Sequence, residues 1–134
     1  MIGIIIVTHN TLASTLVATA EKIVGPLEQV RAIDIDNSCQ NVESIQQQLG
    51  ETINAMKKEG LQVLIATDMF GGTPSNISLS FFEPEKVEII SGVNLPMILK
   101  LASERQQREL GSLAKFITEY GRKNIFSATE FLGQ

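Results

Sequence analysis

The chain has 134 residues, and its 11 Lys and Arg against 15 Asp and Glu give a formal net charge of −4. This length fits one domain with its own core, and the negative balance argues against nucleic acid or an anionic membrane as the main partner. No apolar run approaches the roughly 18 residues that a membrane-spanning helix needs. The single cysteine excludes an intramolecular disulfide and is typical of the reducing cytoplasm. We therefore expect one cytoplasmic domain over residues 1–134, with no membrane insertion.

The first predicted element is a strand, "GIIIV" at residues 3–7, with apolar residues throughout. This pattern is typical of a strand that is buried on both faces, as in a parallel sheet. Apolar residues then recur at helical spacing from Leu12 to Val24, and Gly25 followed by proline ends this helix. Between the strand and the helix lies His9, which is the only histidine of the chain.

The strand and helix pattern repeats along the rest of the chain. Hydrophobic periodicity predicts strands at 30–35, 61–67 and 86–91, and helices at 42–60, from Pro74, from Pro96 and at 103–120. The last segment, Asn124–Leu132, is apolar enough to pair at a sheet edge, and we expect an antiparallel strand there.

Alternating strands and helices predict an α/β fold with a doubly wound, mostly parallel open sheet and helices on both faces. We expect four parallel strands in the order 2-1-3-4, with the C-terminal strand added at an edge. Strands one and three are neighbours in this order, so His9 and Asp68, which follow them, emerge at the same carboxyl edge. Open α/β sheets bind their ligands at that edge.

The residues at this edge limit the chemistry. A metal site usually needs three or four His, Cys or carboxylate ligands, and the chain has one His and one Cys. The motifs G-x-S-x-G, G-x-G-x-x-G and G-x-x-x-x-G-K-[ST] are absent, which argues against a serine hydrolase and against nucleotide binding. We therefore predict no metal and no cofactor, and we expect the imidazole of His9 to act as a nucleophile.

A neutral imidazole attacks phosphorus through one nitrogen while the other nitrogen carries the proton. Asp68 is the candidate carboxylate that selects this tautomer and stabilises the phosphorylated ring. In "FGGTPS", the backbone of Gly71 and Gly72 and the hydroxyls of Thr73 and Ser75 stand at a predicted helix N-terminus and are candidate phosphoryl ligands. Without a chemical role, His9 would be a surface histidine, Asp68 would cap a turn, and the glycine-rich segment would be an ordinary loop.

Three segments occur in order: "GIIIVTHNTLASTLVATAEKIVG", "TDMFGGTPSNIS" and "SGVNLPMILKL". They resemble the active-site histidine region, the aspartate with its Gly-Gly-(Ser/Thr)-Pro loop, and the Gly-Val-Asn-(Leu/Ile)-Pro-Met segment of the mannose-type enzyme IIA domains. These domains belong to the bacterial sugar phosphotransferase system (PTS). The resemblance covers essentially the whole chain.

The resemblance implies that His9 accepts a phosphoryl group from the phosphocarrier protein HPr on Nε2 and donates it to an enzyme IIB partner, while Asp68 holds Nδ1–H. It also implies that Thr73 and the neighbouring glycine amides face the phosphoryl group, with Asn94 nearby. It further implies a homodimer in which a C-terminal antiparallel strand is exchanged between subunits. Because the sequence stops at Gln134 without a fused IIB domain, we expect a free-standing IIA domain.

Asn10 departs from the family, which commonly has glycine directly after the histidine. Asparagine tolerates a left-handed backbone better than most residues, so the loop can keep its shape, although the side chain adds bulk near the phosphoryl donor. Two other functions stay open at this point. One is the related phosphotransfer subunit of the dihydroxyacetone kinase system, and the other is a regulatory module whose His9 phosphorylation state is read by partners. A third alternative is a small-molecule binding module of flavodoxin-like shape.

Overall fold

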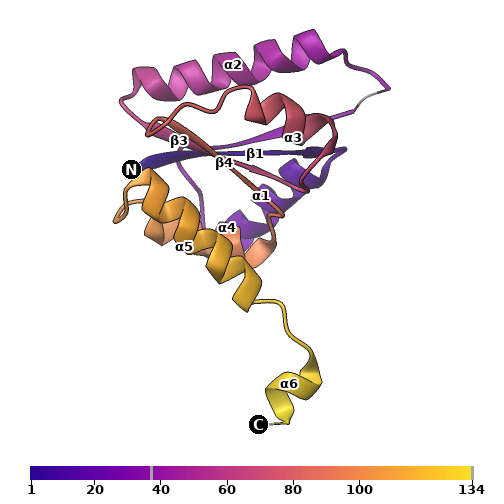
Figure 1. Cartoon of the computed structure of the whole chain (residues 1–134), viewed down its shortest axis with the longest axis vertical. Coiled ribbons are helices and arrows are strands. Elements are labelled where there is room, and N and C mark those ends of the chain that lie inside the picture. The colour runs from indigo at the N-terminus through magenta and orange to yellow at the C-terminus, as the bar shows by residue number, and fades with distance from the viewer. Residues whose placement is uncertain (37, 134) are drawn as a thin grey trace.

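A four-stranded parallel sheet forms the centre of the computed structural model, which describes residues 1–36 and 38–133 (Figure 1). Its strands are β1 (Ile2–His9), β2 (Val30–Ile35), β3 (Gln62–Thr67) and β4 (Val87–Ser91). They are ordered β2-β1-β3-β4, and all pairings between them are parallel. The predicted fold class and the predicted order 2-1-3-4 are thus confirmed.

Helices cover both faces of the sheet, as Figure 1 shows. On one face lie α2 (Val42–Lys58) and α3 (Gly72–Leu79), and on the other lie α1 (Leu12–Val24), α4 (Leu95–Glu104) and α5 (Leu110–Lys123). No helix in these described ranges is both long enough and apolar enough to cross a membrane.

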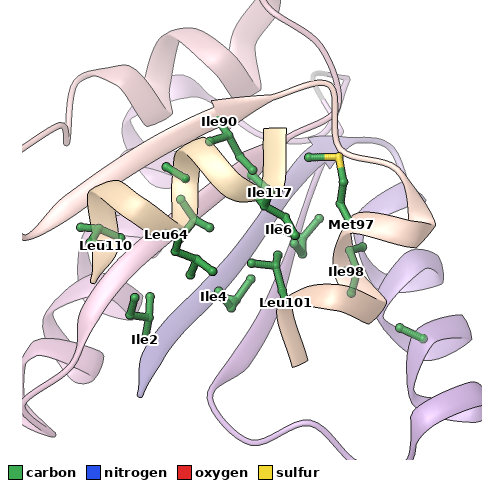
Figure 2. Close-up of a cluster of buried hydrophobic side chains, with 14 of the residues drawn as sticks. Ile2, Ile4, Ile6, Leu64, Ile90, Met97, Ile98, Leu101, Leu110 and Ile117 are labelled. Atoms are coloured by element: carbon green, nitrogen blue, oxygen red, sulfur yellow. The ribbon is translucent and has the colours of Figure 1, made fainter. Parts of the chain in front are cut away.

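Side chains of β1 alternate between two hydrophobic clusters, one on each face. Ile4 and Ile6 pack in the cluster under α1, α4 and α5, which Figure 2 shows, whereas Ile5 and Val7 pack in the cluster under α2 and α3. Because both faces are covered, all four side chains are buried. This explains why the strand has no polar alternation.

The helix that we predicted at 103–120 is not continuous. The structure ends α4 at Glu104 and begins α5 at Leu110, after Glu109 in an extended conformation. The carbonyl of Arg105, in the turn between the two helices, accepts a hydrogen bond from the N–H of Ile2 at 3.3 Å. This hydrogen bond ties the α4–α5 turn to the amino end of β1.

The C-terminal segment contradicts the prediction of an antiparallel edge strand. Residues 128–132 form a short helix, α6 (Ala128–Leu132), and the described part of the sheet ends at β4. The reason is local, because the Oγ of Ser127 accepts a hydrogen bond from the N–H of Glu130 at 3.1 Å and so caps the helix. The spacing Ser-x-x-Glu is that of a capping box. Figure 1 shows α6 projecting away from the sheet and the other helices.

Candidate active site

His9 is the last residue of β1, and Asp68 is the first residue after β3, the neighbouring strand. Asp68 Oδ2 lies 2.8 Å from His9 Nδ1 and also accepts a hydrogen bond from the His9 backbone N–H at 3.0 Å. A carboxylate oxygen accepts but does not donate, so Nδ1 carries the proton, and in the neutral imidazole Nε2 presents its lone pair. The His9 side chain is 40% exposed and that of Asp68 is 14% exposed, so a reactive nitrogen stands at the surface above a mostly covered carboxylate.

The hydrogen bonds from His9 also affect the ionisation of Asp68. Partial burial raises the pKa of this carboxyl, but the hydrogen bonds from the His9 ring and backbone, together with the imidazolium charge, outweigh that effect. The pKa of Asp68 therefore lies below its ordinary value. The carboxylate therefore stays ionised at neutral pH and can offset a positive charge on the imidazole ring.

Asn10 adopts the left-handed conformation, with φ 53°, and its N–H donates to the carbonyl of Ile35 at 2.8 Å. The chain therefore makes the tight turn after His9 with an asparagine in the left-handed region. The backbone hydrogen bond anchors this turn to the end of β2.

Gly72 lies directly against the His9 ring. A Cβ added at this position would stand 3.2 Å from both Cε1 and Nε2 of His9, and the residue has φ +83°. Its neighbour Gly71 has φ +94°, but a Cβ there would meet nothing within 4 Å. The absence of a side chain at Gly72 thus leaves room beside the nitrogen that is free to react.

The N-termini of α1 and α3 differ in how they are capped. In α1, the N–H of Ala13 donates to Thr8 Oγ1 at 2.6 Å, and Ser14 donates to Asp34 through its N–H at 3.0 Å and its Oγ at 2.6 Å. In α3, which begins at Gly72 beside His9, no side chain caps the helix. The α3 terminus is therefore the one beside His9 that can offer N–H groups and the positive end of a helix dipole to an anion.

Thr8 and Asp34 cap the N-terminus of α1, a role that the sequence pattern does not predict. Thr8 had a visible signal, because a polar residue directly follows an apolar run at a strand end. Asp34 lies opposite Thr8 in the β1–β2 register, and this relationship is visible only once the strands are paired.

The other predicted site residues occupy different environments. Thr73 is half-buried and follows Gly72 in the first turn of α3, whereas Ser75 is fully buried, and among the described residues its hydroxyl has no hydrogen-bond partner. Asn94 caps α4 by accepting from the N–H of Met97 at 3.1 Å, and its amide donates to the carbonyl of Gly121 at 3.2 Å. The fold thus brings His9, Asp68 and Gly72 together, while both polar ends of Asn94 are bonded between α4 and α5.

In the described ranges, no three His, Cys, Asp or Glu side chains gather into a group that could hold a metal ion. The chemistry that this arrangement supports without further groups is nucleophilic attack by Nε2 on an electrophile held at the α3 terminus.

The chain is similar to several known proteins. The family described as "PTS system fructose IIA component" matches residues 3–118. A fructose-specific EIIA component of Bacillus subtilis (strain 168) is 26% identical over 98% of this chain and 90% of its own length. The mannose-specific EIIAB component of Escherichia coli (strain K12) is 32% identical over 92% of this chain, which spans 38% of that longer protein.

Solved structures show the same fold. The phosphotransferase system component EIIA from Streptococcus agalactiae superposes with a TM-score of 0.87 at 25% identity, and the match covers 97% of this chain and 99% of that one. A mannose/sorbose-specific IIA subunit from Enterococcus faecalis gives a TM-score of 0.82 at 22% identity, with 94% and 93% of the two chains covered. The chain belongs to the family of mannose-type IIA components of the sugar phosphotransferase system.

Proposed function

We propose that His9 is the phosphoryl carrier of this domain and that it accepts the group from HPr and passes it to an enzyme IIB component. Membership of the family gives the chain a phosphotransfer role in sugar uptake. The main support for His9 as the carrier is the 2.8 Å contact between His9 Nδ1 and Asp68 Oδ2, because it leaves the lone pair of Nε2 free to react. We assign this exchange to the cytoplasm.

In the first step, Nε2 of His9 attacks phosphorus, the Nε2–P bond forms, and the bond between phosphorus and the donor atom breaks. The ring then carries a proton on Nδ1 and the phosphoryl group on Nε2, and Asp68 offsets its positive charge. In the second step, a nucleophile of the acceptor attacks the same phosphorus and returns the neutral imidazole. No proton has to leave Nδ1 in either direction.

The α3 terminus supplies the groups that hold the phosphoryl oxygens. We assign this role to the first-turn N–H groups of Gly72 and Thr73 and to the Thr73 hydroxyl, because no side chain caps this helix and Gly72 lies against the ring. Preorganised amides of this kind stabilise developing charge without reorganising during the reaction. Ser75 is a weaker candidate because its side chain is fully buried.

We also propose that the domain works as a homodimer whose interface covers the exposed apolar side chains of residues 125–132, which we call the α6 segment. Ile125, Phe126, Phe131 and Leu132 are between 57% and 76% exposed, and the Phe126 and Phe131 rings stack with centroids 5.7 Å apart. Clustered exposed apolar side chains mark association surfaces. A second copy of the chain can cover these side chains while α6 keeps its helical form.

The test of the phosphoryl role is incubation with enzyme I, HPr and phosphoenolpyruvate, followed by mass spectrometry. We expect one phosphoryl group per chain, which is labile in acid and stable in alkali, and none in the His9→Ala variant. Acid-labile phosphate on His9→Ala would contradict the assignment. Subsequent addition of a IIB component should remove the group from the wild-type protein.

A further inference from the structure

Phe70 is an aromatic side chain that the fold holds in solvent next to the active site. It is 79% exposed and stands two residues after Asp68. The backbone that precedes it is held in place, because the Met69 N–H donates to Asp68 Oδ1 at 3.0 Å and the Met69 carbonyl accepts from Thr67 Oγ1 at 3.2 Å. An aromatic side chain on a fixed backbone offers a large apolar area at low entropic cost to a binding partner.

Two more apolar side chains extend this surface. Met69 is 53% exposed and Leu12, the first residue of α1, is 44% exposed. Leu12 follows His9 by three residues, and Met69 and Phe70 follow Asp68 directly, so the three come from the connections after the adjacent strands β1 and β3. We call Leu12, Met69 and Phe70 the apolar lip.

The charges at this edge all have one sign in the half that contains β1 and β2. Asp34, in β2, accepts a hydrogen bond from the N–H of Ser14 in the first turn of α1. Asp36 follows β2, and Glu43 lies in the first turn of α2. The sequence of the four strand-to-helix connections and of the first helical turns after them contains no Lys or Arg, although the chain has 11. Hydrogen bonds from Ser38 lower the pKa of Asp36, so this carboxylate is ionised at neutral pH.

Two cationic residues follow Gly121 in the last turn of α5. The contact of Asn94 with the carbonyl of Gly121 brings the end of α5, with Arg122 and Lys123, towards the β4 side. Arg122 is paired with Glu119 at 2.8 Å. The strand-to-helix connections are therefore acidic on the β2 side of His9 and contain no cationic residue to offset that charge.

We propose that the apolar lip and the acidic residues Asp36 and Glu43 form a docking surface for a protein partner whose complementary face has an apolar socket ringed by Lys and Arg. The proposal rests on the phosphoryl role of His9. A phosphoryl group that approaches an acidic edge is repelled unless cations accompany it, and the groups that we assign to it at the α3 terminus are amides and a hydroxyl without a positive charge. The partner must supply the positive charge, and the same cations pair with the acidic side of the edge.

The experiment measures phosphoryl uptake from two donors, phospho-HPr and phosphoramidate. Phosphoramidate needs no docking, because its N–P bond breaks as the Nε2–P bond forms and ammonia leaves. We compare Phe70→Ala with the matched control Phe82→Ala, since Phe82 is 51% exposed and follows α3 at its far end. Phe70→Ala should lower kcat/KM for phospho-HPr by about tenfold or more, as loss of an aromatic anchor does. The control should match the wild type, and the ratio of the two donor rates should change only for Phe70→Ala.

The charge arm of the experiment uses the double variant Asp36→Asn with Glu43→Gln. The matched control is Glu51→Gln on the same helix, about 12 Å further from the edge at 1.5 Å per residue. We expect kcat/KM for phospho-HPr to fall about threefold or more in the double variant only, and to fall with rising salt in the wild type. A salt-independent rate with an unaffected double variant would overturn the basic partner face.

Equal rates of Phe70→Ala and Phe82→Ala with phospho-HPr would overturn the apolar anchor. Uptake from phosphoramidate but not from phospho-HPr in the wild type would also overturn the docking surface, while leaving the carrier role of His9 intact. Failure of the wild type to take up phosphate from either donor would instead remove the proposed function, and the docking surface with it.

Discussion

One oxygen of Asp68 holds His9 by two hydrogen bonds, at 2.8 Å from Nδ1 and at 3.0 Å from the backbone N–H. The same oxygen therefore orients the ring and fixes the strand end that carries it. An aspartate that only capped a turn would use backbone donors of its own loop, as Asp68 Oδ1 does with the N–H of Met69. The two oxygens of this carboxylate thus have separate tasks, one towards the imidazole and one towards the loop.

The Asp68→Asn variant tests the task of the first oxygen. An amide keeps a hydrogen-bond acceptor but loses the negative charge and can present its NH₂ to Nδ1, which permits the wrong tautomer. We expect the fold to survive and phosphoryl uptake from phospho-HPr to slow by at least about tenfold. ¹⁵N NMR of the single imidazole should show a loss of the Nδ1–H tautomer.

The matched control is Asp34→Asn, because Asp34 also accepts two hydrogen bonds, in this case from Ser14. This variant should leave the tautomer of His9 and its phosphoryl uptake from phosphoramidate unchanged, whereas Asp68→Asn should change the tautomer and lower the uptake. If both aspartates behave alike in uptake and in the NMR spectrum, Asp68 has no orienting role.

The lowered pKa of Asp68 also predicts how stability depends on pH. The folded state binds the Asp68 proton less tightly than the unfolded state, in which the carboxyl has its ordinary pKa of 3.8. The stabilising contribution of Asp68 is therefore complete above that value and is lost as the pH falls through the lower folded pKa. The free energy of unfolding of the wild type relative to Asp68→Asn should decrease between about pH 5 and pH 3, as measured by urea denaturation. A difference that is constant over this range would contradict the ionised Asp68–His9 pair.

The sheet and the His9–Asp68 pair were predictable because each depends on a strong, local pattern. Residues 3–7 form an unbroken apolar run, which indicates a doubly covered parallel strand, and parallel strands deliver their following residues to one edge. The contact between His9 and Gly72 was not predictable in detail, because it depends on positive φ values in a loop.

The errors at the C-terminal end have a different cause. The apolar content of residues 124–132 favours a strand, whereas the Ser-x-x-Glu spacing at Ser127 favours a helix start, and the helix forms. The predicted helix at 103–120 ran through the break after Glu104, where a backbone contact to Ile2 competes with helix continuation. Neither apolar content nor periodicity reports such a tertiary contact.

The exposed α6 segment predicts a concentration-dependent dimer. Sedimentation should give about twice the chain mass of 14.7 kDa. A double variant, Phe131→Ser with Leu132→Ser, should raise the dissociation constant by about tenfold or more. Ile23→Ser is the matched control, because Ile23 is 59% exposed on α1 and is not in the α6 segment. A wild-type protein that sediments as a monomer at micromolar concentration would contradict the dimer.

Substitution of the two adjacent loop glycines separates backbone strain from crowding of the reactive nitrogen. Both residues have positive φ, +94° at Gly71 and +83° at Gly72, so alanine at either position strains the backbone and costs about 1–3 kcal/mol of folding stability. Only at Gly72 would the new Cβ stand 3.2 Å from His9 Nε2, whereas at Gly71 it would meet nothing within 4 Å. We therefore expect similar losses of stability in thermal denaturation, but a selective loss of phosphoryl uptake in Gly72→Ala, by at least about tenfold. Phosphoramidate should reveal the same selective loss, because the methyl group obstructs the nitrogen itself and not the docking of a protein. Equal uptake by the two variants would show that the space beside Nε2 is not where the phosphoryl group enters.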